Sequence, residues 1–366
     1  MIRAVVMPGA GGPCEVREFA EPELAPDSAL MRVVASEVCG TDVHLRDSKL
    51  AGVPYPIVPG HVSCGRIEKL RGSMRDIAGA ELREGDFVTF LDVHKTCNAC
   101  WSCLVAKAST RCPERRVYGI TYGLGDGILG GWASHLELLT GVHVIRLDAV
   151  SVERFMAGGC GLPTALHAVD RAAIQIGDTV LVLGVGPVGL SAIAFARASG
   201  AGKVLAIGAP RLRLDAALAV GADRVLDLSD HDIEQRHAWI LEQTEGRGAD
   251  VTIEAAGAPS AAVEAQRFTR DAGRVVIVGQ YTDHGSVAWN PHTDLNKKHL
   301  DVRGCWGSDF SHFYRGVQWL ADEARGRPWD SIPIERFGLD RCNEALTDVE
   351  AGRVVKALVD PAVQGV

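Results

Sequence analysis

Residues 179–196 read TVLVLGVGPVGLSAIAFA, and this stretch decides the fold. It begins as a short apolar run typical of a buried strand, turns at three glycines, and continues as an Ala-rich segment of helical character. The spacing Gly-x-Gly-x-x-Gly between a strand and a helix is typical of a dinucleotide-binding turn. The first glycine allows the tight turn, the second lets the backbone approach a pyrophosphate, and the third lets helix and strand pack closely. The sequence therefore predicts a cofactor-binding turn made of Gly184, Gly186, Pro187, Val188 and Gly189.

The same stretch has two other interpretations. It is uncharged and just long enough to cross a membrane, but its glycines and Pro187 would break a helix there. A purely structural glycine turn with no ligand stays open as the alternative to a cofactor site.

The pattern continues on the C-terminal side of this stretch. The runs KVLAIG, RVLDL, DVTIEAAG and RVVIVG are short and rich in β-branched residues, and most are separated by Ala- and Leu-rich stretches of helical length. That alternation predicts a parallel sheet covered by helices on both faces, which is an α/β fold of the doubly wound, Rossmann type.

The end of the run KVLAIG bears on the choice of cofactor. A NAD-binding unit usually places an acidic residue there for the ribose 2′-OH, and this chain has Gly208, followed by Arg211 and Arg213. Such a loop lacks the carboxylate that repels a 2′-phosphate and has cations that could pair with one, so NADP is slightly favoured over NAD. The alternative, that both arginines are the solvated first turn of a helix, has about equal weight.

The remainder of the chain has a different organisation. Residues before about 158 consist of short strands punctuated by PGAGGP, PYPIVPG and REGD, while the segment from about 306 carries two helical stretches and the strand KALVD. A chain of 366 residues is also longer than a single hydrophobic core usually supports. We therefore expect two domains, the first of them rich in β-strands.

Composition excludes several classes of function. The net charge of −8 argues against a general nucleic-acid-binding protein, which needs a basic face for phosphates. The N-terminus lacks the apolar core of a signal peptide, so we expect a cytoplasmic protein with no membrane partner that acts on small molecules. In a reducing compartment its ten cysteines are expected to be metal ligands or core residues and not disulfides.

Four of the cysteines form a metal-binding pattern. The spacing C-x2-C-x2-C-x8-C lies in a polar stretch, which argues against four unrelated core cysteines, and four thiolates can close a tetrahedral shell around zinc. Such a closed site stabilises a lobe but has no position left for a substrate. The predicted structural zinc ligands are Cys97, Cys100, Cys103 and Cys112.

These motifs, together with CGTDVH from residue 39, PGH from residue 59 and GGWASH from residue 130, occur in the order seen in zinc-dependent medium-chain alcohol dehydrogenases. The chain resembles that family over essentially its whole length. The resemblance implies a GroES-like, β-rich catalytic domain over 1–158 with a zinc lobe at 97–112. It further implies a Rossmann NAD(P)-binding domain over 159–305, a return to the catalytic domain over 306–366, and a homodimer or homotetramer.

The resemblance also implies the site residues and a second zinc ion, making two per chain. Thr41 would take the proton of the alcohol and His44 would pass it on, while Asp42 would orient the ligand histidine and Lys356 would lie near the cofactor phosphates. Each residue alone has a plainer interpretation as a core, turn or surface residue, and their joint occurrence favours the functional one. The implied ligands of the catalytic zinc are Cys39, His61 and Cys160.

One position departs from the family pattern. Val62 follows His61 where relatives commonly carry glutamate, while all three direct ligands are present. We expect a retained metal with altered surroundings, in an enzyme that transfers hydride between a secondary or polyol-like alcohol and NAD(P). A zinc-poor carbonyl or quinone reductase and a silenced, dinucleotide-binding sensor or structural protein are the alternatives. Candidate pocket residues are Tyr122, Trp289 and Trp306.

Overall fold

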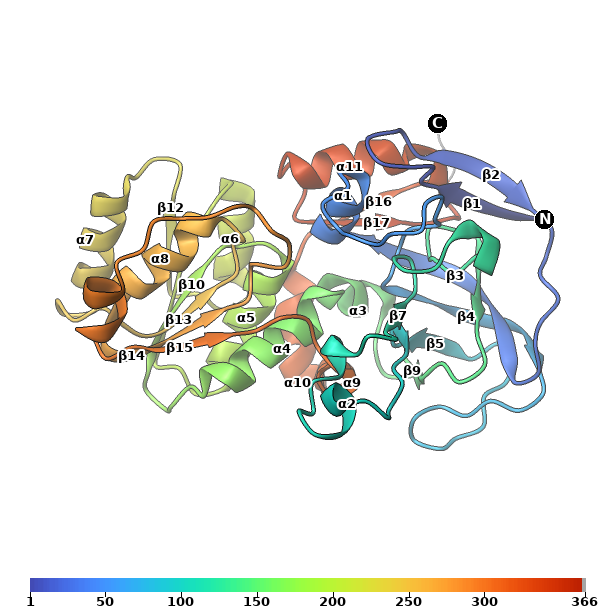
Figure 1. The fold of residues 1–366 in the computed structure, drawn as a ribbon, viewed down its shortest axis with the longest axis horizontal. Coiled ribbons are helices and arrows are strands. Elements are labelled where there is room, and N and C mark those ends of the chain that lie inside the picture. Colours follow the sequence, from blue (N-terminus) through green and yellow to red (C-terminus); the bar gives the residue numbers. More distant parts are fainter. Residues whose placement is uncertain (364–366) are drawn as a thin grey trace. The chain divides into compact units, whose positions relative to one another are not determined.

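The computed structural model describes residues 1–363, and the chain divides into two compact units (Figure 1). The first unit contains Met1–Gly159, Asp309–Ala321 and the described residues from Ile334 onward. The second unit contains Cys160–Ser308 and Asp322–Pro333. Among the described residues, no helix is both long and apolar enough to span a bilayer.

The second unit is built on a six-stranded sheet whose strand pairs are all parallel. Its strand order, β12-β11-β10-β13-β14-β15, is the doubly wound order of dinucleotide-binding domains. The strands are β10 (Thr179–Leu183), β11 (Lys203–Gly208), β12 (Arg224–Asp227), β13 (Ala249–Glu254), β14 (Thr269–Ile277) and β15 (Asp301–Gly304).

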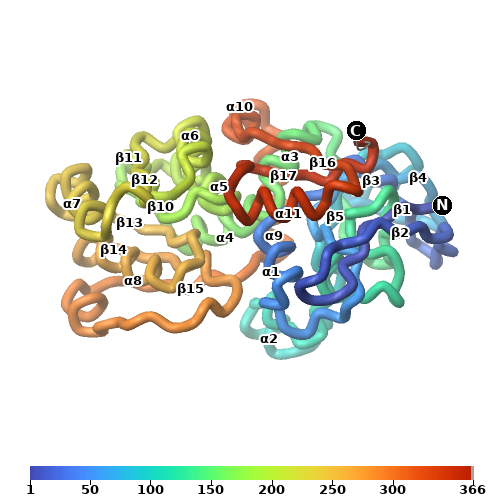
Figure 2. The backbone as a smooth tube through the Cα atoms, turned by 90° about the horizontal axis from the view of Figure 1, so that it is seen from above, coloured from blue at the N-terminus to red at the C-terminus, as the bar shows by residue number. Residues whose placement is uncertain are grey.

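Helices cover both faces of this sheet, and Figure 2 shows α5 and α6 on one side of it and α8 on the other. The strands, α7 and α8 together enclose a core that includes Leu181, Leu205 and Phe268. The helices of this unit are α4 (Gly161–Ala172), α5 (Pro187–Ala198), α6 (Arg211–Ala219), α7 (Ile233–Gln243), α8 (Pro259–Phe268) and α10 (Glu323–Gly326).

The first unit is mainly β-structure, as expected. Its main sheet has the order β16-β17-β3-β4-β5-β9, and β8 pairs with β3. The strands are β1 (Ile2–Val6), β2 (Glu15–Phe19), β3 (Ser28–Val38), β4 (Ser63–Arg71), β5 (Phe87–Phe90), β6 (Val93–Lys95), β7 (Arg116–Val117), β8 (His135–Leu138), β9 (Val144–Arg146), β16 (Ile334–Phe337) and β17 (Lys356–Val359). The helices are α1 (Gly40–Arg46), α2 (Trp101–Leu104), α3 (Val152–Gly158), α9 (Phe310–Ala321) and α11 (Cys342–Glu350).

Strands from distant parts of the chain pair within this sheet. Strand β17 pairs antiparallel with β3, with Ala357 opposite Val38, and Figure 1 shows the red C-terminal strands beside the blue β3. The last strand thus lies next to the segment that leads into Cys39.

The segment 322–333 lies with the second unit, whereas the family resemblance implies a C-terminal part of the catalytic domain that runs without interruption over 306–366. The reason is a packing contact: Trp329 is buried, donates its indole N–H to Ser191 on α5 at 3.1 Å, and packs against Phe195. Trp329 therefore packs this piece of chain against α5.

Candidate active site and metal centres

The loop before β4 holds His61 in a buried position. Gly60 has φ of +92°, and a Cβ on it would lie 2.5 Å from the Ser36 hydroxyl and from the Trp132 ring, so only glycine fits. The backbone N–H of Gly131 donates to the Gly60 carbonyl at 2.7 Å. The GGWASH stretch thus packs directly on the PGH turn, and His61 is 5% exposed.

Helix α1 carries the other residues expected at the catalytic centre. Its N-cap is Cys39, whose backbone N–H donates to the Asp42 carboxylate at 2.9 Å. Thr41 and His44 are three residues apart, so they share one face of the helix, and both are half-buried. Asp42 is fully buried and faces inward.

The three expected catalytic zinc ligands come together. The ligand atoms of Cys39, His61 and Cys160 all lie within 4.8 Å of one another, and the Cys39 sulfur is 3.9 Å from His61 Nε2. On the other side of the imidazole ring, His61 Nδ1 lies 4.0 Å from the Asp42 carboxylate. Two thiolates and one imidazole suit zinc and leave one position open, as a catalytic zinc site requires.

The electrostatics of this group favour a cation. Burial alone would lower the pKa of His61, but the neighbouring Cys39 thiolate outweighs burial and raises the pKa to about 10. Burial raises the pKa of Asp42. His61 Nδ1 and one Asp42 oxygen are buried without a hydrogen-bond partner, which is costly. A divalent ion would use the negative potential of the thiolates, so these residues fit zinc.

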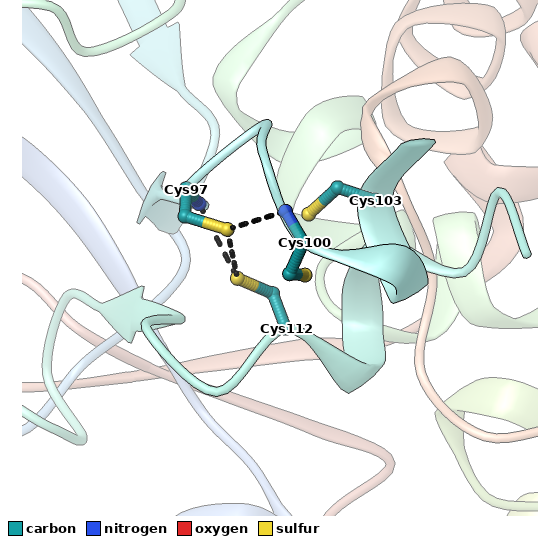
Figure 3. A group of neighbouring side chains, drawn as sticks. All are labelled: Cys97, Cys100, Cys103 and Cys112. Atoms are coloured by element: carbon teal, nitrogen blue, oxygen red, sulfur yellow. Dashed lines mark hydrogen bonds between the residues drawn. The ribbon is translucent and has the colours of Figure 1, made fainter. Parts of the chain in front are cut away.

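The four cysteines of the lobe also converge. All four sulfur atoms lie within 4.8 Å of one another, and Figure 3 shows them turned toward a common space. The backbone N–H of Cys100 donates to the Cys97 sulfur at 3.3 Å, and N–H groups of Ala99 and Cys100 lower the pKa of Cys97 to about 7. A thiol that ionises this readily is prepared to bind metal.

The glycine turn has the shape that a dinucleotide requires. Gly184 has φ of +98°, and a Cβ on it would lie 2.7 Å from the backbone of Ala255, while a Cβ on Gly189 would overlap the Gly184 carbonyl. A Cβ on Gly186 would meet nothing within 4 Å, so that glycine is not required for packing. Pro187 and Val188 follow at the first turn of α5. Space at the helix N-terminus is what an anionic diphosphate needs.

The loop after β11 has its own packing restraint. Gly208 ends the strand, and a Cβ there would overlap the Val185 side chain. A larger residue at 208 would therefore require the Val185 side chain to shift. Arg211 begins α6, is exposed, and pairs with Asp215 at 2.9 Å, whereas Arg213 is half-buried.

Lys356 has a different environment from the one expected. It is 2% exposed and forms an ion pair with Glu37, which is fully buried. A buried ammonium beside a carboxylate argues against a contact with cofactor phosphates, and that role stays a prediction. Glu37 is not among the residues predicted from the sequence. A lone acidic residue in the strand run SALMRVVASEV and a lone lysine in VVKALV are nevertheless a signal for a buried ion pair.

The candidate pocket aromatics are all engaged within their own units. Tyr122 contacts His94 Nδ1 through its hydroxyl at 2.6 Å, and Trp289 donates to Gln266 at 3.0 Å and is 47% exposed. Trp306 stacks on Tyr281 with ring centroids 5.4 Å apart. Packing explains each of these rings, and a role in substrate contact stays a prediction.

Comparison with known proteins agrees with this geometry. Residues 25–148 match the family described as the alcohol dehydrogenase GroES-like domain, and residues 187–322 match the family described as zinc-binding dehydrogenase. The chain is 35% identical to 5-exo-hydroxycamphor dehydrogenase of Pseudomonas putida, with 92% of each chain covered. It is 30% identical to the erythritol/L-threitol dehydrogenase of Mycolicibacterium smegmatis, with 96% of each covered.

Solved structures show the same similarity. An alcohol dehydrogenase from Thermotoga maritima superimposes with a TM-score of 0.91 at 31% identity, covering 98% of this chain and 99% of that one. A zinc-binding dehydrogenase from Sinorhizobium meliloti, solved with NADP bound, superimposes with a TM-score of 0.82 at 27% identity, with 99% of each chain covered. The chain therefore belongs to the zinc-dependent medium-chain alcohol dehydrogenase family and is an NAD(P)-dependent oxidoreductase of alcohols.

Proposed function

We propose that the protein oxidises a secondary alcohol to a ketone with a zinc ion held by Cys39, His61 and Cys160. The observation that carries this proposal is the approach of these three ligand atoms to within 4.8 Å of one another, beside the buried Asp42. Zinc, when bound, supplies a Lewis acid for the substrate oxygen, and the dinucleotide accepts the hydride.

The protein's own residues would bind the metal and transfer the hydroxyl proton of the alcohol. The thiolates of Cys39 and Cys160 and the imidazole of His61 would hold the metal, and the Asp42 carboxyl group, 4.0 Å from Nδ1 of that imidazole, would orient the ring. Thr41 accepts the hydroxyl proton of the alcohol, and His44, on the same face of α1, passes it toward solvent. Removing this proton lets the carbinol carbon release its hydride.

We propose a second zinc ion at Cys97, Cys100, Cys103 and Cys112, which makes two per chain. Four thiolates leave no position for a substrate, so this ion stabilises the lobe between β6 and β7. The low pKa of Cys97 supports metal binding at neutral pH.

We propose NADP as the preferred dinucleotide. Support comes from Gly208, which removes the carboxylate that would repel a 2′-phosphate, and from the arginines at 211 and 213 in the next turn. The Sinorhizobium meliloti relative has NADP bound. The arginine positions carry more weight than this likeness, because cofactor choice can differ among relatives.

For the substrate we propose an alicyclic secondary alcohol, because the relative at 35% identity is named for 5-exo-hydroxycamphor, a ring-borne secondary alcohol. A polyol is the second candidate, favoured by the relatives named for erythritol/L-threitol and for sorbitol. Both classes present a secondary carbinol to the metal and differ in polarity.

The experiment measures turnover of zinc-replete protein with 5-exo-hydroxycamphor, other alicyclic secondary alcohols, and a polyol series, each with NAD⁺ and NADP⁺. We expect the highest kcat/KM for an alicyclic alcohol with NADP⁺. Cys160→Ala should abolish turnover and remove one of two zinc ions while the fold survives. Cys305→Ala, a buried cysteine outside both ligand groups, is the matched control. A protein that binds both zinc ions and dinucleotide but turns over no alcohol would be the silenced sensor instead.

A further inference from the structure

A buried ion pair lies behind the candidate catalytic metal site. Glu37 on β3 is fully buried, and Lys356 at the start of β17 is 2% exposed. Their side chains are in direct contact although the residues are 319 positions apart in the chain. Buried ion pairs are weak stabilisers compared with apolar packing, so such a pair calls for another role.

The pair contacts the segments of all three ligands. Glu37 precedes Cys39 by two residues, and its backbone N–H donates to the carbonyl of Val62, the residue after His61, at 2.9 Å. A Cβ on Gly159, the residue before Cys160, would overlap both the Glu37 carboxylate and the Lys356 ammonium. The two side chains therefore fill the space against which the backbone before Cys160 rests.

Further hydrogen bonds hold Glu37 itself in place. The buried indole of Trp132 donates to the Glu37 carbonyl at 2.9 Å. Strand pairing places Ala357 opposite Val38, so Lys356 is carried by a strand that is fixed beside Cys39. Glu37 is thus restrained through its N–H, its carbonyl and its carboxylate, and it can transmit that restraint to its neighbours.

We propose that the Glu37–Lys356 pair is the positioning device of the candidate catalytic metal site, setting the spacing of the segments that carry Cys39, His61 and Cys160. Glu37 provides a buried carboxylate two residues before Cys39, in a chain whose residue after the ligand histidine is Val62. The proposal rests on the proposed function, because it requires a metal at these three residues.

The pair acts through geometry and charge together. Loss of the Glu37 carboxylate would leave the Lys356 ammonium buried near the cation and release the restraint on Gly159. Loss of Lys356 would remove the buried ammonium that Glu37 contacts and weaken the restraint on the end of β3. In both cases the three ligands hold the metal less well, so the metal should leave faster.

The test measures metal release from the full-length, zinc-replete protein into a chromophoric chelator at fixed pH. The two sites should release in two phases, and the four-cysteine site serves as the internal reference. Cys160→Ser and Cys100→Ser assign the phases. For Glu37→Gln and Lys356→Met we expect at least a tenfold faster release from the three-residue site and an unchanged rate from the four-cysteine site.

Two variants make the test decisive. The double variant Glu37→Gln/Lys356→Met leaves no unpaired buried charge, so it should fold even where a single variant does not, and it should still release the metal faster. Asp360→Asn, which breaks the 2.7 Å pair with Arg336 in the same sheet, is the matched control and should change neither rate.

The outcomes separate this inference from the proposed function. A wild-type protein that holds only the four-cysteine ion would end the proposed function and the inference with it. Two ions in the wild type, with the same ratio of release rates in the variants, would overturn the positioning role alone. Equal acceleration of both phases would show that the pair only stabilises the fold and would also overturn it.

Discussion

At the scale of the residue, Gly208 links packing to cofactor choice. The end of β11 is closed by Val185, which follows the first glycine of the dinucleotide turn, and a Cβ at position 208 would overlap it. The steric restraint on a side chain at 208 therefore comes from the same turn for which we propose a bound diphosphate. With no carboxylate at 208, the first turn of α6 would supply the charge near the ribose of the proposed dinucleotide.

Arg211→Ala tests that charge. Hydrogen bonds to charged groups contribute about 1.5–3 kcal/mol, so we expect KM for NADPH to rise roughly tenfold or more while KM for NADH stays nearly constant. Asp215→Ala is the control, because it removes the ion-pair partner of Arg211 and leaves the cation in place. Equal effects of Arg211→Ala on both dinucleotides would exclude a 2′-phosphate contact at this residue.

At the scale of the element, the turn into α5 contains two glycines with different surroundings. Gly189 is required by packing, since any side chain would overlap the Gly184 carbonyl, whereas Gly186 borders open space and has φ of −76°, which any residue can adopt. The local motif is the same for both glycines, and only their surroundings distinguish them.

Gly189→Ala and Gly186→Ala therefore form a matched pair. We expect Gly189→Ala to lower the unfolding temperature by several degrees, because backbone atoms must move. Gly186→Ala should leave that temperature unchanged yet weaken dinucleotide binding roughly tenfold or more, because the methyl group occupies the space for the pyrophosphate. Thermal unfolding and cofactor fluorescence titration measure the two effects. Unweakened binding by Gly186→Ala would count against the predicted diphosphate position.

We expect the N-terminus of helix α9 to depend on pH. Asp309 accepts hydrogen bonds from the N–H of Ser311 at 2.9 Å and of His312 at 3.3 Å, and its contact with the His312 side chain holds the pKa of Asp309 well below its usual range. A depressed carboxyl pKa means that the stabilisation is present above the ordinary Asp pKa of about 3.9 and is lost as pH falls below it.

Asp309→Ala should therefore destabilise the protein at pH 7 by about 0.5–1 kcal/mol, the usual effect of losing a cap, reduced by partial exposure. The difference in unfolding free energy between wild type and variant should shrink between about pH 4 and pH 2. Urea unfolding at several pH values measures it. A difference that stays constant down to pH 2 would show that the charge of Asp309 contributes nothing.

At the scale of the whole molecule, each unit has its own sheet and its own core. The first unit contains separate buried clusters, one with Val5 and Phe337 and another with Met31 and Phe90, and the second unit contains a cluster around Leu181. The four-cysteine lobe belongs to the first unit and has little regular structure, since α2 has four residues and β7 two. A metal would replace the missing core there.

Removal of metal by a strong chelator should therefore act locally. We expect amide hydrogen exchange across 96–115 to accelerate roughly tenfold or more, while β10 and β13 of the second unit keep their protection. Cys100→Ser should reproduce this pattern without a chelator. If exchange accelerated equally in both units, the lobe would not be the part that the metal stabilises.

The sequence by itself determined what depends on neighbours within about twenty residues. The strand, turn and helix of 179–196, the α/β rhythm after it, and the four cysteines between 97 and 112 each carry their spacing in one short stretch. Cys39, His61 and Cys160 were named through a family resemblance, because no local pattern relates residues so far apart. Only the tertiary structure decided how they meet, that segment 322–333 packs on α5 through Trp329, and that Lys356 pairs with Glu37. The physical reason is that strand pairing and burial depend on which segments, distant in sequence, pack against one another and exclude water. The sequence does not distinguish a buried lysine from a solvated one, because burial depends on the strand that pairs beside it.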